Sequence, residues 1–469
     1  NFVFMDARLL KLFKKLPAAD RRRLCEWTQC SLFNKRPEVA ALCAHITQHA
    51  AHPDSMRAER LHEAAFPGQV YQAARLRHTI SYLLQAVRGY LAWSEWNATS
   101  DSAPWLLQSL RKRGLDFMFP YEEERAMKAL EAEPLRDAGF HYLRYRLLQE
   151  KLEMASRSER SARLSLQPLP DALTAFYLSD MLRLACVALT HQAVAGQAYH
   201  FAVLDRILDS EDKENLLAEP AVGIYFHAYQ MLKNGGEEGE TSFQHLKELL
   251  ARHAEIFAAT EMRGLYLMAI NGCIRRMNAG QRTYVREAFE LYRAALTRGF
   301  LLEDGWMSGF TYKNIIRIGA VLGEEPWTRD FLQQYREALH PRDRDNLYKY
   351  NLAYLHLQKQ DYAQAMPLLQ QINFDDALHQ LEARRMLLRS YFELGEWEAL
   401  DSLLTSFGAY LRRQKGLGYH RTTNEKLLSF VKKLVELPSG TTARQKLRTE
   451  IENTPDVAER QWLLERCAG

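Results

Sequence analysis

The chain has 469 residues, enough for about two to four ordinary domains or for one long repeat array. Hydrophobic residues make up 47% of it and charged residues 26%, which excludes an intrinsically disordered chain. The formal net charge of +4 is small for this length, so the overall charge does not predict nucleic-acid binding.

The first part of the chain, residues 5–98, is predicted to form a helical domain of its own. Leu9 and Phe13 belong to an apolar face with helical spacing, and Pro17 ends that segment. The same period recurs from Leu76 to Leu91. No signal sequence is recognisable, and no apolar run approaches the ~18 residues of a membrane span. We therefore expect a cytoplasmic protein without membrane contact.

The cysteines and histidines do not predict a metal site. The six cysteines are scattered, and the pair Cys25 and Cys30 has no second pair at zinc-finger spacing. Reduced thiols in a cytosolic protein are the expected state. His45 and His49 lie four positions apart, on one helix face, but no carboxylate or thiolate completes a set of ligands around them. We expect no metal and no cofactor.

The rest of the chain divides by its polar stretches. Residues 97–104 are polar without periodicity and are predicted to form a domain boundary. Residues 105–200 are expected to form irregular helical hairpins, and residues 201–410 more regular ones. Residues 411–469 are expected to form a basic loop and capping helices, which the exposed end of an array requires. Strand signals are nearly absent, and glycine and proline are few, so the sequence predicts an all-α protein.

Two copies of one pattern lie between Asn346 and Leu404. The first copy has the turn Gln360-Asp361-Tyr362, and the second has Gly395-Glu396-Trp397, with the aromatic residues 35 positions apart. Each turn lies between two segments of helical period. A helix, a tight turn with an aromatic residue and a second helix, repeated about every 34 residues, are typical of stacked helical hairpins.

This pattern resembles the tetratricopeptide repeat, most clearly over residues 311–410. The resemblance implies a right-handed α-solenoid in which the first helices of successive hairpins line a concave groove. Ala353 and Ala365 match the small residues of the repeat, which are needed where two helices cross closely. The sequence departs from the repeat at His356 and at Leu369, where an aromatic residue is usual, and at Leu400, where alanine is usual.

In this family, fixed positions on the first helices bind the partner. Lys313 and Asn351 match positions at which some members hold the terminal carboxylate of a peptide. Arg317 stands where asparagine is usual, Glu382 where lysine is usual, and Met386 where lysine or arginine is usual. The resemblance implies a basic, aromatic-lined groove for a protein or peptide partner, and the alternative is a set of solvated surface residues. The groove positions are Lys313, Arg317, Tyr350, Asn351, Tyr354, Arg385 and Arg389.

A basic patch between residues 409 and 433 follows the repeats and contains a single acid, Glu425. It could bind phosphates or an acidic partner, and the alternative is an ordinary solvated face. Residues 205–219 are acidic, and two patches of opposite sign could support self-association. The basic residues are Arg412, Arg413, Lys415, Arg421, Lys426, Lys432 and Lys433.

The sequence contains no phosphate-binding loop, no dinucleotide-binding glycine pattern and no nucleophile elbow. We therefore expect no catalytic residues and no enzyme activity. The predicted function is a scaffold or adaptor that binds a protein in its groove. The alternatives are a regulator that binds nucleic acid or another polyanion through the basic patch, and a structural subunit that self-assembles.

Overall fold

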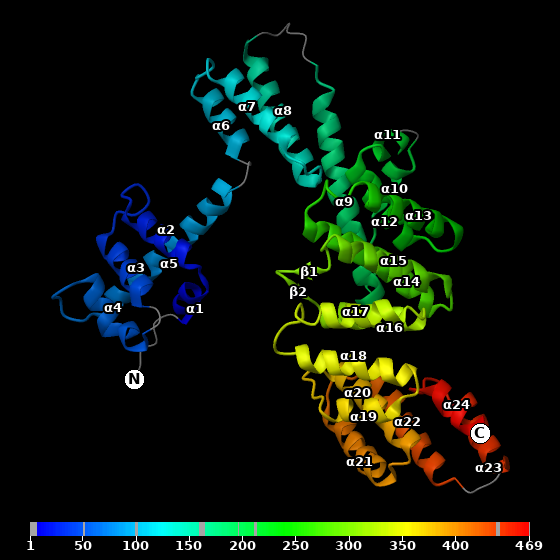
Figure 1. The fold of residues 1–469 in the computed structure, drawn as a ribbon. Helices are drawn as coiled ribbons and strands as arrows, with labels where there is room; N and C mark the ends of the chain where they lie inside the picture. The colour runs from blue at the N-terminus through cyan, green and yellow to red at the C-terminus, as the bar shows by residue number, and fades with distance from the viewer. Residues whose placement is uncertain are drawn as a thin grey trace. The chain divides into compact units, whose positions relative to one another are not determined.

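The computed structural model describes residues 7–49, 52–98, 102–158, 165–195, 197–210, 213–437 and 441–468. These residues form 24 α-helices, one 3₁₀ helix and one two-stranded hairpin, so the predicted all-α class is confirmed (Figure 1). The chain divides into two compact units, which we call unit 1 (Asn1–Tyr177) and unit 2 (Leu178–Gly469).

Unit 1 contains two separate apolar cores. The first core consists of residues between 9 and 90, including the fully buried Phe13, Leu42 and Val87. The second core includes Leu107 and Phe140. The helices of the first group are α1 (Ala7–Lys15), α2 (Ala18–Gln29), α3 (Pro37–His49), a 3₁₀ turn (Pro53–Met56), α4 (Ala58–Ala65) and α5 (Ala73–Ala98); those of the second are α6 (Ser102–Lys112), α7 (Phe119–Ala132) and α8 (Ala138–Ser158).

Helix α9 (Pro168–Ala195) contains the division between the two units. Its segment Pro168–Gln192 is long and apolar enough, by length and composition, to cross a membrane, and a third of an apolar 18-residue stretch within it is buried in the protein. This helix is an exception to the expectation that no apolar segment approaches the length of a membrane span, but a core helix of a soluble protein has the same length and composition, so the absence of membrane contact stays a prediction. Residues 99–101 of the predicted boundary lie outside the described residues.

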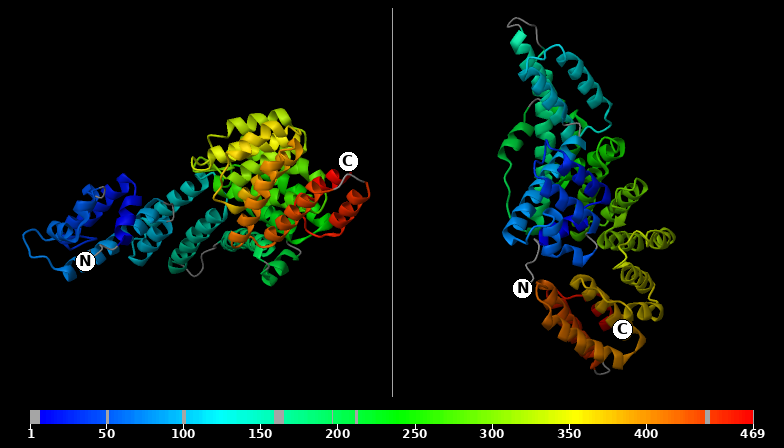
Figure 2. Two further views of the ribbon diagram at one scale, coloured as in Figure 1. Left: turned by 90° about the horizontal axis from the view of Figure 1, so that it is seen from below. Right: turned by 90° about the vertical axis from the view of Figure 1, so that its left-hand side faces the viewer.

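Unit 2 consists of helices that pack mainly on their neighbours in the chain. The pairs α12–α13, α14–α15, α16–α17, α18–α19 and α20–α21 pack closely, and α12–α14, α16–α18 and α18–α20 are also in contact (Figures 1 and 2). Its first helices are α10 (Ala202–Leu208), α11 (Lys213–Leu217), α12 (Pro220–Lys233), α13 (Gly236–Arg252), α14 (Ala259–Asn278) and α15 (Thr283–Thr297). The others are α16 (Gly309–Val321), α17 (Glu325–Gln334), α18 (Arg344–Gln358), α19 (Tyr362–Gln370), α20 (Ala377–Leu394), α21 (Trp397–Arg413), α22 (Tyr419–Val435), α23 (Thr441–Asn453) and α24 (Arg460–Ala468).

Local signals fix where these helices begin and end. Ser308, Asp361 and Asp376 cap α16, α19 and α20, each accepting a hydrogen bond from a backbone N–H of the first turn. Gly395 ends α20 in the left-handed conformation, with φ of 72°, which a glycine adopts without strain. The left-handed backbone at the end of α20 therefore explains the glycine at position 395, in the turn of the second copy of the repeated pattern.

The short hairpin of β1 (Leu302–Glu303) and β2 (Trp306–Met307) is the strand structure within the described part of the chain. Asp304 and Gly305 form its turn, and both have positive φ. Asp-Gly is a favoured pair for such two-residue turns. The hairpin leads directly into Ser308, the cap of α16, so it sets where the first helix of the 311–410 segment begins.

Candidate functional site

The predicted groove residues lie on three helices that pack side by side. Lys313 and Arg317 are on α16, Tyr350 and Tyr354 on α18, and Arg385 and Arg389 on α20. The structure brings these six side chains into one charged cluster, which we call the α16–α20 cluster; it also contains Glu382 and Glu459.

Glu382 on α20 is the centre of one half of this cluster. Its Oε2 accepts hydrogen bonds from Lys313 Nζ at 3.2 Å, from Arg317 Nη2 at 3.1 Å and from the hydroxyl of Tyr350. Arg317 also donates to the Tyr350 hydroxyl at 2.6 Å and lies over the ring of Tyr354. A carboxylate on α20 therefore joins α16 and α18.

Burial and charge act in opposite directions on these groups. Burial lowers the pKa of Lys313, and the neighbouring Arg317 lowers it further, although Glu382 opposes both. Burial alone would raise the pKa of Glu382, but Arg317 and Lys313 hold it below the usual glutamate value. Glu382 is therefore ionised at neutral pH and acts as the counter-ion of two cations.

Glu459 is the centre of the other half. It lies just before α24 and contacts Arg389 Nη1 at 3.0 Å and Arg385 Nε at 3.6 Å. Trp462 of α24 donates its indole N–H to Glu393 of α20 at 2.6 Å. The C-terminal segment thus places a carboxylate of the same chain on two of the cations that were expected to face a partner.

Asn351 and Tyr350 are not available to a partner in the way the sequence predicted. Asn351 is fully buried, and its side-chain amide donates to the Leu347 carbonyl of the same helix at 2.8 Å. The ring of Tyr350 is fully buried, and Lys313 is 7% exposed. The prediction that Tyr350 and Asn351 face a partner is wrong, because neighbouring helices cover that side of α18.

The cluster carries an excess of positive charge, most of it on three partly exposed arginines, while Lys313 is buried. The side chains of Arg317, Arg385 and Arg389 keep 34%, 21% and 24% of their exposure. Together with Lys313 they are four cations in contact with two carboxylates, Glu382 and Glu459. This arrangement can attract an anionic group without any rearrangement of the helices.

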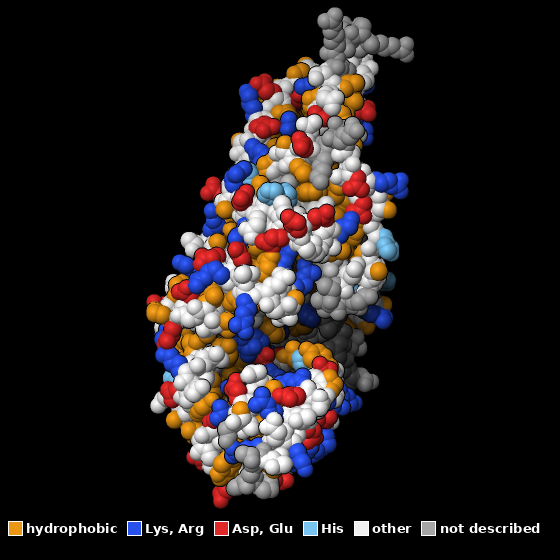
Figure 3. Space-filling model, turned by 90° about the vertical axis from the view of Figure 1, so that its right-hand side faces the viewer, with side chains coloured by type: hydrophobic (Ala, Val, Ile, Leu, Met, Phe, Trp, Pro, Cys, Tyr) orange, Lys and Arg blue, Asp and Glu red, His pale blue; other side chains and the backbone are white. Residues whose placement is uncertain are grey.

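The predicted basic patch is spread over α21, the following loop and the whole of α22. Arg421 donates to the Gln414 carbonyl, Lys426 to the Pro455 carbonyl, and Lys433 pairs with Glu450. Arg412, Lys415 and Lys432 are exposed. On the face drawn in Figure 3, basic and acidic side chains are interleaved. In the acidic stretch, Asp205 pairs with Lys233, while residues 211 and 212 lie outside the described residues.

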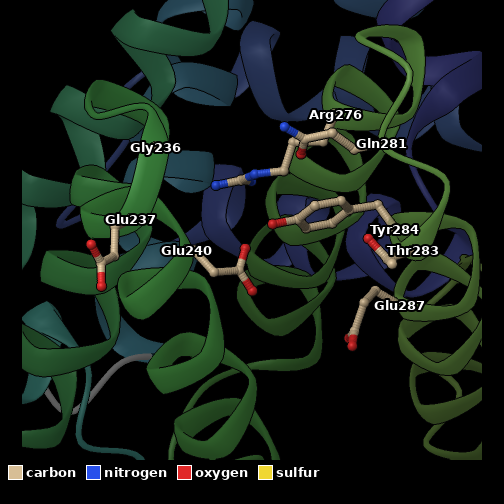
Figure 4. Close-up of a pocket in the computed structure, with 8 residues that line it drawn as sticks. All are labelled: Gly236, Glu237, Glu240, Arg276, Gln281, Thr283, Tyr284 and Glu287. Atoms are coloured by element: carbon tan, nitrogen blue, oxygen red, sulfur yellow. The ribbon is translucent and has the colours of Figure 1, made fainter.

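A polar pocket of about 370 Å³ lies between the starts of α13 and α15 and the end of α14 (Figure 4). Arg276 and Tyr284 extend towards Glu240, whereas Glu237 and Glu287 point away from that centre. Arg276 lies over the rings of Phe243 and Tyr284, and Glu240 accepts from Gln244 at 2.8 Å. No sequence pattern predicts this pocket, because its lining comes from three separate helices.

Within the described residues, no group of three or more His, Cys, Asp or Glu side chains is arranged to hold a metal ion. His45 contacts the Ser55 carbonyl, and its ring lies 4.8 Å from that of His49. Cys43, Cys186, Cys273 and Cys467 are buried thiols.

A scan against models of known protein families and a search of curated proteins found no match to the chain.

Proposed function

We propose that unit 2 is a right-handed solenoid of tetratricopeptide-like hairpins that acts as a non-enzymatic scaffold. Its first helices α16, α18 and α20 would bind an acidic segment of a protein partner. The observation that carries the proposal is the excess of positive charge in the α16–α20 cluster, where four cations contact two carboxylates. The order of helix contacts in unit 2 is compatible with stacked hairpins.

The residue types of the cluster suit an interface. Arginine binds carboxylates through two parallel N–H groups, and arginine and tyrosine are common anchors of protein interfaces. Tyr354 lies against the guanidinium of Arg317, which holds that cation in place. Because the cations sit on helices rather than on loops, their spacing is fixed before a partner arrives, which reduces the entropy lost on binding.

Glu459 already occupies part of this surface, and this gives the proposal a sharp test. Replacing Glu459 by glutamine removes one of the two carboxylates, which leaves Arg389 without a counter-ion and Arg385 with Glu382 alone, at 4.0 Å. We expect an acidic probe, such as a fluorescent octaglutamate peptide, to bind the variant about three- to tenfold more tightly than the wild type. Fluorescence anisotropy measures the affinity, and added salt should weaken it.

Two controls accompany this titration. Glu325→Gln removes an exposed carboxylate that pairs with Arg329 and Lys359, outside both the cluster and the basic patch, and it should leave the affinity unchanged. Arg385→Gln combined with Arg389→Gln should weaken probe binding. Equal affinity for the probe in the wild type, the Glu459 variant and this double variant would remove the cluster as the binding surface.

Three further measurements separate the scaffold from the two alternative functions. If single-stranded DNA binds and Arg412→Gln with Lys415→Gln abolishes that binding, a polyanion bound by the basic patch becomes the better proposal. If light scattering shows the mass rising with protein concentration, the structural subunit does. The partner captured by the wild-type chain from its own cells should be lost in the Arg385/Arg389 double variant.

A further inference from the structure

A second pocket, of about 510 Å³, lies among α9, α10, α12 and α14 in unit 2. Its volume falls in the range that small organic ligands occupy in proteins. The walls include the rings of Phe201 and Tyr229, which meet edge to face at 6.4 Å between centroids. Arg275, at the end of α14, lines the same space. The pocket thus combines an apolar wall with a cation.

The other charges of this pocket are already paired. Asp205 accepts from Lys233 Nζ at 2.7 Å and from the Tyr229 hydroxyl at 2.8 Å. Burial would raise the pKa of Asp205, but Lys233 and Tyr229 hold it below the usual aspartate value, so the ion pair is intact at neutral pH. The charges of Lys233 and Asp205 therefore compensate each other beside α10.

Arg275 keeps an uncompensated charge. No side chain of the described residues forms a hydrogen bond or an ion pair with its guanidinium. Burial lowers its pKa, and the neighbouring Arg276 lowers it further, with no carboxylate acting in the opposite direction. Arg275 is exposed to solvent and stays protonated, and no carboxylate of the described residues pairs with its guanidinium, so an anion that enters the pocket can pair with it directly.

The adjacent Arg276 has different surroundings from Arg275. It lines the other pocket, beside Glu240 and over the rings of Phe243 and Tyr284. Two consecutive arginines thus line different pockets, one with carboxylates in its lining and one whose single carboxylate is neutralised by Lys233. A further donor lines the same pocket: the amide oxygen of Gln192 accepts from the Tyr199 N–H at 3.1 Å, which leaves the Gln192 NH₂ group for a ligand.

We propose that this pocket binds an organic anion, whose carboxylate or phosphate pairs with Arg275 and whose flat apolar body lies against Phe201 and Tyr229. The site is separate from the α16–α20 cluster and does not depend on the scaffold function. A guanidinium binds a carboxylate or a phosphate through two parallel N–H groups, which suits either head group. The rings of Phe201 and Tyr229 supply an apolar contact that an organic ligand makes and an inorganic ion does not.

The test uses the full chain and three probes that separate the contribution of the ligand's anionic head group from that of its apolar body. Phenyl phosphate carries both parts, inorganic phosphate carries the head alone, and benzyl alcohol carries the body alone. We expect phenyl phosphate to bind more tightly than either of the others in isothermal titration calorimetry. Arg275→Gln should weaken phenyl phosphate binding by about tenfold, the effect of one lost charge-assisted hydrogen bond.

Arg252→Gln is the matched control, because Arg252 is another exposed arginine in the last turn of a helix of unit 2 but does not line the pocket. It should leave binding unchanged. Thermal melts of both variants should coincide with that of the wild type, since Arg275 makes no internal contact to lose. Undetectable phenyl phosphate binding at millimolar concentration, or equal binding by the wild type and Arg275→Gln, would overturn the proposal.

A further arm distinguishes a free small molecule from a group carried on a protein. A short peptide with a central phosphotyrosine presents the same ring and phosphate on a backbone. Binding of this peptide as tightly as phenyl phosphate, with the same loss in Arg275→Gln, supports the anion site and assigns it to a protein-borne group. Binding of phenyl phosphate alone supports the site and assigns it to a free metabolite.

Discussion

Replacing Glu382 by glutamine is expected to lower the free energy of unfolding of unit 2 by about 3 kcal/mol at neutral pH, as for the breaking of other largely buried ion pairs. The substitution keeps the shape of the side chain but removes the charge that Lys313 and Arg317 share. Lys313 is 7% exposed and has no other anion within contact distance among the described residues, so water does not replace the lost partner. Urea denaturation, followed together with hydrogen exchange of peptides from α16, α18 and α20, measures the loss.

A second substitution separates the charge effect from loss of packing. In the double variant Glu382→Gln with Lys313→Met, the unpaired ammonium is gone and a side chain of similar length fills its place. We expect this variant to recover a large part of the lost stability. Glu325→Gln, which removes an exposed partner of Arg329 and Lys359, should leave the denaturation curve unchanged. Equal curves for Glu382→Gln and the wild type would show that the cluster contributes nothing to stability.

The pH dependence has a definite sign. The pKa of Glu382 is lower in the folded protein than in the unfolded chain, so its contribution is complete above the usual glutamate pKa. That contribution is lost as the pH falls through the lower, folded value. The difference between the wild type and Glu382→Gln should therefore be constant at neutral pH and shrink in acid, and pH-dependent denaturation tests this directly.

The sequence predicted the helical class, the regular segment and most of the charged cluster because these depend on local patterns. A period near 35 residues fixes which side of each first helix faces the same direction as its neighbours. The resemblance to the tetratricopeptide repeat, carried over in this register, implies that Lys313, Arg317, Arg385 and Arg389 share one surface, and these four side chains contact the same two carboxylates in the structure. The departure at Glu382 from the usual lysine was visible too, and it marks the residue that organises the cluster.

The parts that the sequence did not predict depend on contacts between distant segments. Glu459 lies 70 residues beyond Arg389, and no periodic pattern connects the two. Asn351 was assigned to the groove from its register, but whether a register position stays open depends on how closely α18 packs on α16 and α20. The unpaired charge of Arg275 has the same origin, since its surroundings come from four helices.

Replacing Gly319 by alanine is expected to destabilise unit 2 by about 2 kcal/mol, the usual effect of adding a methyl group to a full interior. A β-carbon at this position of α16 would lie 2.2 Å from Thr328 Oγ1 on α17. Thr328 is fully buried, and its hydroxyl donates to the Glu324 carbonyl at 2.6 Å, so moving the hydroxyl away from the new methyl group would disturb this hydrogen bond. Gly319 also lies 34 positions before Ala353, another small residue that is fully buried, on α18.

Gly264→Ala is the control, and it is expected to change the stability in the opposite direction. Gly264 is inside α14, and a β-carbon there would meet no atom within 4 Å. Alanine should stabilise this helix by up to about 1 kcal/mol, because it favours the helical backbone. Urea denaturation of both variants measures the two shifts. The double variant Gly319→Ala with Thr328→Ala removes the clashing hydroxyl and leaves the β-carbon of residue 328 at 3.4 Å, so it should regain part of the loss. If it regains nothing while Gly264→Ala behaves as expected, the close crossing of α16 and α17 is not what requires a glycine at 319.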